Sequence, residues 1–243
     1  MSSGDSLRNR VYNDLEKSIK LDMIGELVAG FVHEIRNPLT SILGFVQLLE
    51  QGSIKQDYFN IIHSSFHDIE EYLKELLIIA KPQPAEQKIV NIKLLVENVI
   101  ELVKHKRSFK NIHIFVDHSI EGLDYICDPA QIKMVIKHLV MNSIEAIHND
   151  GIVTIEVWRE DVNLLLKITD NGVGMSRERL AKLGEPSYSL TENGTGIGLM
   201  ICYRIICQYN GSIYVESEEN KGTTVEVRLP LSIKKASDDC FLF

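Results

Sequence analysis

A lengthwise apolar stripe across residues 24–49 constrains the fold more than any other feature of this 243-residue chain. Its positions are separated by steps that alternate between four and three residues: Ile24, Val28, Phe31, Ile35, Pro38, Ile42, Phe45 and Leu49. This spacing is typical of a helix whose seam packs along other helices. After the glycine break in "EQGSIKQ", a second periodic stretch follows, with Tyr58, Ile62, Phe66, Ile69, Leu73, Leu76 and Ala80. The pattern predicts a helical hairpin.

A two-helix hairpin cannot cover its own apolar stripes, so we expect it to pair with a second copy into a four-helix bundle and make the protein a homodimer. In the alternative, the hairpin packs onto the rest of the chain, but the heptad character of the seam favours the bundle. Two prolines in the polar stretch "KPQPAEQ" indicate a linker. The sequence therefore predicts two domains, residues 1–82 and residues 83–243.

Beyond the linker, helices alternate with strands. "NIKLLVENVIELVKHKRS" is expected to be a helix, and "NIHIFVDHS" and "LDYICD" short strands. A longer helix follows, with Asp128 as its cap, Pro129 in its first turn and Gln131 completing a capping box. Two strands, "GIVTIEVWRE" and "VNLLLKITD", a glycine-rich stretch, a helix over residues 197–208 and two closing strands complete an α/β layer domain on a mixed sheet. The tail after about residue 232 shows no period, and we expect it to be disordered.

Charge and cysteine content argue against several classes of function. Asp and Glu number 34 against 26 Lys and Arg, a formal net charge of -8, so the overall field repels nucleic acid and anionic lipid. The cysteines have neither CxxC nor zinc-site spacing, which indicates thiols in a reducing compartment: Cys127, Cys202, Cys207 and Cys240. No apolar run approaches the roughly 18 residues that span a bilayer. We expect a cytoplasmic chain that meets a membrane only through a sensor region absent from this sequence.

His33 is the first candidate for chemistry. It lies two residues from the seam positions Phe31 and Ile35, which is the outermost, solvent-facing position of the predicted helix. An imidazole is a usable nucleophile at neutral pH without extreme tuning. Glu34 beside it could accept the ring proton or hold the tautomer. From this stretch alone, a plain surface histidine is the alternative.

Pro38 interrupts the same helix. Proline removes a backbone donor and clashes with the carbonyl four residues earlier, that of Glu34, at a cost of about 3 kcal/mol in a plain helix interior. We therefore expect the helix to bend or loosen beside His33. The rival zinc motif HExxH requires a second histidine at position 37, but that residue is Asn37.

Two glycine-rich stretches indicate a nucleotide site, although each is weak evidence alone. "DNGVGM" places Asp170 at the end of an apolar strand, where its carboxylate could accept an exocyclic amine and the two glycines after it permit close approach of a flat ligand. Asp-Asn-Gly is also a frequent turn. "NGTGIGL" places three glycines at the mouth of a helix, where backbone donors favour phosphate: Gly194, Gly196 and Gly198. Neither the dinucleotide fingerprint nor "GxxxxGK[ST]" fits.

Asn142 is a candidate metal ligand on the helix that Asp128 caps. It lies just off the apolar stripe of that helix. A neutral amide oxygen is a modest ligand for Mg²⁺, which commonly takes nucleotide phosphates as further ligands. By itself, Asn142 would be read as a surface residue.

Taken in order, "FVHEIRNPL", "HLVMNSIEA", "DNGVGM" and "NGTGIGL" resemble the H, N, G1 and G2 boxes of sensor histidine kinases. The resemblance covers about residues 20–231 and is closest to the sporulation kinases of endospore-forming bacteria. It implies a multidomain α and α+β fold. An antiparallel helical hairpin that forms a dimeric four-helix bundle and carries the phosphoacceptor would precede an α/β sandwich ATP-binding domain of the Bergerat type, shared with gyrase and Hsp90.

The resemblance also implies a role for each matching residue. His33 is the phosphoacceptor, Glu34 its acid/base neighbour and Asn37 the residue that helps orient water for dephosphorylation of the partner. Asn142 is the Mg²⁺ ligand, and Asp170 reads the adenine amino group. Further positions match ATP-binding residues: Glu145, Met175 and Leu199; Gly172 and Gly174 in the adenine pocket; Gly194, Thr195, Gly196 and Gly198 at the phosphate-side lid and helix start; and Thr223, whose hydroxyl supports the aspartate.

Between the G1 and G2 boxes, the sequence departs from the family pattern. Relatives often carry a Phe-rich, Thr-Thr-Lys type segment there, whereas this chain has "EPSYSLTENGTG". Ser187 and Tyr188 stand at the aromatic positions, and Thr191 stands where the lysine would be. The loss of a phosphate-contacting lysine puts nucleotide affinity and lid closure in question.

The function that the resemblance implies is an ATP-dependent protein-histidine kinase. Mg-ATP would phosphorylate His33, and the phosphoryl group would pass to an aspartate on the receiver domain of a response regulator, in a sporulation phosphorelay. The hairpin would also be the docking surface for a protein inhibitor. Two alternatives stay open. One is a nucleotide-binding phosphotransfer adaptor with weak or no kinase activity, and the other is an ATPase related to gyrase or Hsp90, which leaves the arrangement around His33 unexplained.

Overall fold

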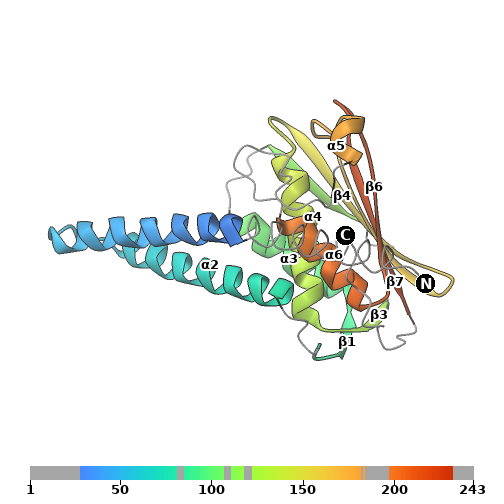
Figure 1. Cartoon of the computed structure of the whole chain (residues 1–243), viewed down its shortest axis with the longest axis horizontal. Coiled ribbons are helices and arrows are strands. Elements are labelled where there is room, and N and C mark those ends of the chain that lie inside the picture. The colour runs from blue at the N-terminus through green and yellow to red at the C-terminus, as the bar shows by residue number, and fades with distance from the viewer. Residues whose placement is uncertain are drawn as a thin grey trace, which may run out of the picture. The chain divides into compact units, whose positions relative to one another are not determined.

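The computed structural model describes residues 28–80, 85–106, 111–117, 122–181, 183 and 197–231. The described residues form two compact units, a helical hairpin that ends at Ala80 and an α/β unit (Figure 1). The predicted domain boundary after residue 82 falls outside the described residues and stays a prediction. The same holds for the disordered tail.

The hairpin consists of a first helix, residues 28–50, and α2, Gln56–Ala80. Gly52 lies just after the end of the first helix, and its φ of 82° falls in the left-handed region that glycine adopts without strain. The Gly52 N–H donates to the Leu49 carbonyl at 3.0 Å, which is one of the bonds of a glycine-terminated helix end. The predicted glycine break is therefore the turn of the hairpin.

The predicted seam is the better-buried side of the first helix. Phe31 is only 2% exposed. The later seam residues are half-buried: Ile35, Pro38, Ile42, Phe45 and Leu49. Phe45 packs on Tyr58 of α2, with ring centroids 5.1 Å apart. Val28 is 47% exposed, and Ile24 lies outside the described residues. From Phe31 to Leu49, the seam is confirmed.

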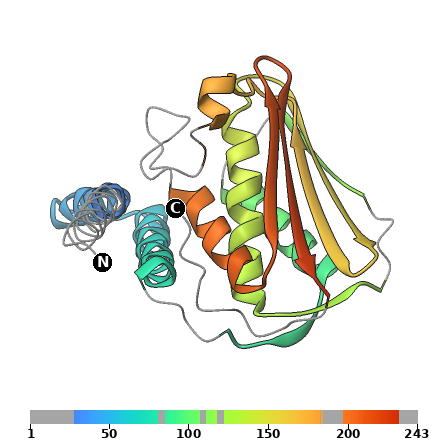
Figure 2. The ribbon, with the colours of Figure 1, turned by 45° about the vertical axis from the view of Figure 1, so that its right-hand side comes forward.

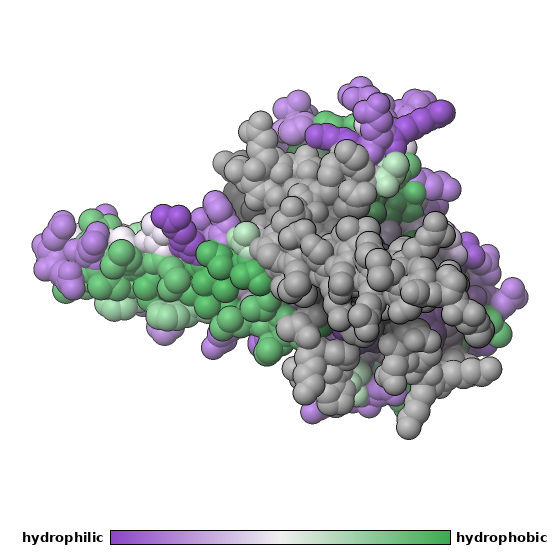
Figure 3. Space-filling model, in the orientation of Figure 1, coloured by the Kyte–Doolittle hydropathy of each residue, from purple (hydrophilic) through white to green (hydrophobic). Residues whose placement is uncertain are grey.

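Both helices also carry apolar side chains that a single hairpin leaves in solvent. We call them the outer stripe, and their exposed fractions run from 36% to 59%: Val28, Val32, Leu39, Leu43 and Val46 on the first helix, and Phe59, Phe66, Leu73 and Leu77 on α2. Hydrophobic residues line the hairpin in the space-filling view (Figure 3). Phe66 and Leu73 belong to the predicted periodic stretch of the second helix, and in a single hairpin they are 53% and 46% exposed.

The α/β unit is built on a five-stranded mixed sheet. Its strands lie in the order β2-β4-β5-β7-β6. β2 and β4 are parallel, and the other neighbours are antiparallel, as the predicted mixed sheet requires. The strand bounds are Ile112–Val116 for β2, Gly151–Glu160 for β4, Asn163–Asp170 for β5, Ser212–Glu218 for β6 and Gly222–Pro230 for β7. A separate antiparallel pair joins β1, Lys88–Asn91, to β3, Asp124–Cys127. The sequence did not predict β1.

Three helices cover one face of the sheet (Figure 2). They are α3, Ile92–Lys106, α4, Pro129–Glu145, and α6, Ile197–Gln208. The helix-facing side chains of β4 are buried, with Val153 and Ile155 at 0% exposure, whereas the alternate Glu156 is half-buried. The core therefore lies between the helices and one side of the sheet, which confirms the predicted layered sandwich. A short helix, α5 (Arg177–Ala181), was not predicted.

The start of α4 shows how a distant residue modifies a local motif. Asp128 caps the helix, and its Oδ1 accepts from the N–H groups of Ala130 at 2.9 Å and Gln131 at 3.4 Å. The predicted capping box would have Gln131 return a bond to the Asp128 N–H. Instead, the Asp128 N–H donates to the Tyr209 hydroxyl at 2.9 Å, and that hydroxyl donates to Gln131 Oε1 at 3.1 Å. The cap is confirmed, and Tyr209 replaces the second half of the box.

Cysteine chemistry and membrane character were also predicted. Cys127 and Cys202 are buried free thiols, as expected. Cys207 is disulfide-bonded, so the expectation of free thiols at all four cysteines is wrong at that position.

Within the described part of the chain, no helix has the length and apolar character needed to cross a membrane.

Candidate nucleotide site and phosphoacceptor

The phosphoacceptor candidate lies on an exposed face of the hairpin. His33 and Asn37, one helical turn apart, are both exposed, and Glu34 is half-buried. The expected solvent-facing position of His33 is therefore observed. The helix continues through Pro38, so the proline removes the bond that the Glu34 carbonyl would accept without ending the helix. A bend at Pro38 stays a prediction.

Asp170 is the polar centre of the candidate nucleotide site. It ends β5, is only 5% exposed, and accepts two backbone N–H bonds at Oδ1, from Gly172 at 2.9 Å and Thr223 at 3.2 Å. Burial raises the pKa of Asp170 above its usual range, and hydrogen bonding from Gly172, Thr223 and Ser143 of α4 lowers it in part. A buried carboxylate held in this way is a preorganised acceptor for a ligand amine.

The glycines after Asp170 are required by the packing of the protein backbone. A Cβ at Gly172 would lie 2.5 Å from the Ala146 carbonyl oxygen at the end of α4. Gly174 has a φ of 61°, and its Cβ would overlap the Glu218 carbonyl oxygen. The sequence suggested that both glycines make room for a flat ligand. In the structure, protein backbone fills the space beside them.

Thr223 is bound to Asp170 by its backbone. The two residues are partners in the β5–β7 register. The Thr223 N–H donates to Asp170, while its hydroxyl lies 2.9 Å from the Ser217 hydroxyl. The predicted hydroxyl support is thus replaced in this structure by backbone support.

Asn142, the predicted magnesium ligand on α4, and Glu145, a predicted ATP-binding residue of the same helix, face solvent. Asn142 and Glu145 are exposed, whereas Ser143 and Ile144 between them are buried. An amide and a carboxylate oxygen are donors that Mg²⁺ accepts, so this pair fits the ion chemically. Among the described residues, no group of three or more His, Cys, Asp or Glu side chains could hold a metal alone. The nucleotide phosphates would have to complete the coordination.

The remaining predicted residues lie between β5 and α5, on α6, or outside the described residues. Met175 is 4% exposed. Gly198 packs against α4, because its Cβ would lie 2.9 Å from His138 Nδ1, and Leu199 next to it is half-buried. The other lid positions lie outside the described residues: Ser187, Tyr188, Thr191, Gly194, Thr195 and Gly196.

Sequence reasoning missed two residues of this site. Ser143 falls on the buried side of α4, where a lone hydroxyl among apolar neighbours could have signalled a polar partner. Gly222 has a φ of 106°, and a Cβ there would overlap the Asp170 carbonyl oxygen. Its role depends on the β5–β7 register, which the sequence does not reveal.

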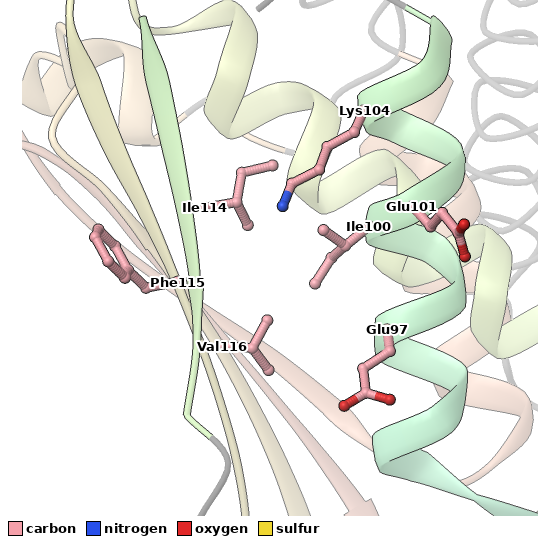
Figure 4. A pocket seen from close by; sticks show the side chains of 7 residues that line it. All are labelled: Glu97, Ile100, Glu101, Lys104, Ile114, Phe115 and Val116. Atoms are coloured by element: carbon pink, nitrogen blue, oxygen red, sulfur yellow. The ribbon is translucent and has the colours of Figure 1, made fainter.

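A hollow of about 630 Å³ lies elsewhere in the α/β unit, between α3 and β2. Figure 4 shows its lining: Glu97, Ile100, Glu101, Lys104, Ile114, Phe115 and Val116. None of these is a predicted site residue. The lining is largely apolar and has no glycine-rich turn, so the hollow does not have the character of the candidate nucleotide site.

Both halves of the chain match known families. Residues 23–85 match "His Kinase A (phospho-acceptor) domain", and residues 127–233 match "Histidine kinase-, DNA gyrase B-, and HSP90-like ATPase". Among curated proteins of Bacillus subtilis, sporulation kinase E is 39% identical over 92% of this chain and 31% of its own length. Sporulation kinase C is 38% identical over 88% of this chain and 51% of its own length. The chain therefore spans about a third to a half of these relatives.

Solved structures agree with the fold. The histidine kinase ThkA in complex with the response regulator protein TrrA has a TM-score of 0.61 and 27% identity, covering 92% of this chain and 66% of that one. The Acinetobacter baumannii histidine kinase AdeS has a TM-score of 0.60 at 21% identity, covering 82% of this chain and 98% of that one. Sporulation kinase B of Bacillus subtilis is 35% identical over 91% of this chain, so the identities do not favour one sporulation kinase strongly over another. With its phospho-acceptor domain followed by a gyrase- and HSP90-like ATPase domain, the chain belongs to the histidine kinases and is similar to the sporulation kinases.

Proposed function

We propose that the chain is an ATP-dependent protein-histidine kinase that phosphorylates itself at His33. The observation that carries the proposal is the buried Asp170, which offers a fixed acceptor for the adenine amino group. The exposed His33 on the phospho-acceptor helix supplies the nucleophile. In the reaction, the bond between the γ-phosphorus and its bridging oxygen breaks, a phosphorus–nitrogen bond forms at the imidazole, and ADP leaves.

Each residue then has a proposed role. Asp170 orients the adenine, and Glu34 beside His33 receives the ring proton as the nitrogen is phosphorylated. Asn142 and Glu145 would hold Mg²⁺, which neutralises phosphate charge when bound. Asn37, one turn from His33, orients water for dephosphorylation of the partner.

The proposed partners follow from the hairpin. The outer stripe would leave nine large apolar side chains in water on a lone hairpin, and pairing with a second copy into a four-helix bundle would bury them. The ThkA–TrrA complex supports docking of a response regulator, to whose aspartate the phosphoryl group would pass. The sporulation kinase relatives support a place in a phosphorelay. Docking of a protein inhibitor on the hairpin and a cytoplasmic location stay predictions.

The test is phosphate uptake from labelled ATP. The chain should gain acid-labile, base-stable phosphate, His33→Gln should gain none, and His63→Gln, an exposed histidine on α2, should behave as the wild type. Uptake by His33→Gln would refute the assignment of the phosphoacceptor. Adding purified response regulators one at a time should then discharge the phosphohistidine.

The alternative of a phosphotransfer adaptor rests on the departure from the family pattern at Thr191. An adaptor would bind ATP and hold phosphate received from another kinase, but it would not phosphorylate itself. Autophosphorylation by the purified chain would exclude it.

A further inference from the structure

β2 is an edge strand of the five-stranded sheet. β4 lies on one side of it, and no other described strand lies on its second side. Two bonds show which backbone groups β4 uses. The Gly151 N–H donates to the Asn111 carbonyl at 3.0 Å, and the Asp117 N–H donates to the Ile155 carbonyl at 2.9 Å. Backbone groups alternate between the two sides of a strand, so the even-numbered residues of β2 direct theirs to the free side: Ile112, Ile114 and Val116.

The hollow of about 630 Å³ opens beside this edge, between β2 and α3 (Figure 4). Its floor is apolar, because Ile100 of α3 is 5% exposed and the side chains of Ile114 and Val116 are half-buried. A strand added to the free side of β2 would bond to its backbone and send alternate side chains toward the hollow. This is the geometry in which sheet edges bind extended peptides.

The charged side chains stand at the two ends of the hollow. In Figure 4, Lys104 points into it beside Ile114 and Glu97 points into it beside Val116, whereas Glu101 points away. Lys104 and Glu97 are seven residues apart on α3, which is about 10 Å along a helix. Residues i and i+4 of a strand lie on one face, about 13 Å apart. A strand with opposite charges four positions apart therefore matches both ends.

We propose that the free side of β2 and the hollow bind an extended peptide of a partner protein with the pattern basic-x-apolar-x-acidic. The peptide adds to β2 as an antiparallel strand, the slightly more stable arrangement. Its basic residue lies opposite Val116 and near Glu97, its apolar residue lies opposite Ile114, and its acidic residue lies opposite Ile112 and near Lys104. None of the predicted nucleotide residues lines the hollow, so the inference does not depend on the kinase reaction.

The test measures binding of labelled peptides to the full chain by fluorescence anisotropy. The probe is acetyl-Thr-Lys-Thr-Val-Thr-Glu-Thr-amide, whose only charges are the Lys and the Glu. The reverse-order peptide, with Glu and Lys exchanged, has the same composition but places each charge beside a like charge. It should bind at least about tenfold more weakly.

A second pair of peptides tests strand addition itself. In this arrangement the Val N–H of the probe faces β2, whereas the N–H of the Thr after it faces solvent. N-methylation of the Val amide should weaken binding at least about tenfold, because it removes a hydrogen bond, and N-methylation of that Thr amide should leave binding unchanged.

Charge exchange on α3 supplies the protein variants. Lys104→Glu should weaken binding of the probe about tenfold, and adding Glu97→Lys should make the chain prefer the reverse-order peptide. A damaged fold cannot reverse a preference, so the double exchange separates recognition from stability. Lys221→Glu is the control and should change neither affinity, because Lys221 lies in the turn between β6 and β7, toward the opposite edge of the sheet.

Several results would overturn the proposal. They are equal affinity for the two peptide orders, equal affinity for the two N-methylated peptides, and a double exchange that does not reverse the preference. Failure of the wild type to bind either peptide order would also refute it. If that failure is accompanied by a lower molar mass of Lys104→Glu in light scattering, a second copy of the chain occupies the edge in place of a partner peptide.

Discussion

Replacing Gly172 by alanine should destabilise the α/β unit through a backbone collision. The new Cβ would lie 2.5 Å from the oxygen and 2.7 Å from the carbon of the Ala146 carbonyl, roughly an ångström inside ordinary contact. The same carbonyl accepts the Val173 N–H at 2.9 Å, so it cannot move away without weakening that bond. Overpacking costs about 1–3 kcal/mol and the strained bond about 1 kcal/mol, so we expect a loss of about 2–4 kcal/mol.

The single tryptophan of the chain makes this loss measurable in one unit. Trp158 lies in β4, so its fluorescence reports unfolding of the α/β unit and not unfolding of the hairpin. With a urea dependence of about 2 kcal/mol per molar, the midpoint should fall by about 1–2 M. Val162→Ala is the control, because this side chain lies in the same unit and is 67% exposed, and its midpoint should not fall. A shift below about 0.25 M for Gly172→Ala would refute the collision.

Three further predictions concern stability, pH and assembly. Tyr209→Phe leaves the buried Gln131 and the half-buried Asp128 N–H without their shared hydroxyl and should destabilise the α/β unit by about 2 kcal/mol in the same urea assay. The same change at the exposed Tyr214 should have no effect. Burial raises the pKa of Asp170, so the folded protein binds this proton more tightly than the unfolded chain does. On acidification, the carboxylate that would bind the adenine amine should therefore be protonated at a pH above the usual aspartate range. The dissociation constant for ATP, measured at decreasing pH from 7, should rise in the wild type as this carboxylate is protonated. The same pH dependence in Asp170→Asn would contradict the prediction. Leu43→Glu, in the outer stripe at 59% exposure, should turn a dimer into a monomer by light scattering. Val162→Glu, at 67% exposure in the α/β unit, should leave the mass unchanged.

Features with a local cause could be predicted from the sequence. The heptad spacing from Phe31 to Leu49 predicts a helix and its better-buried side, because both follow from the 3.6-residue period. Asp128 followed by Pro129 predicts the start of α4, since a cap and a first-turn proline act within a few residues. The exposed position of His33 follows from the same counting.

Features that depend on distant residues could not be predicted. The role of Gln131 changed because Tyr209, 78 residues away, lies between it and the cap. The support of Asp170 by the Thr223 backbone depends on strand register, which no local pattern reveals.

The Tyr209 hydroxyl has a mechanical consequence for α6. Directly after the end of this helix, Tyr209 is bonded to the start of α4, and near the beginning of the helix Gly198 packs on His138 of α4. The two helices therefore contact each other at two separated points along α6. We expect α6 to shift together with α4, and not to tilt against it, when ATP binds.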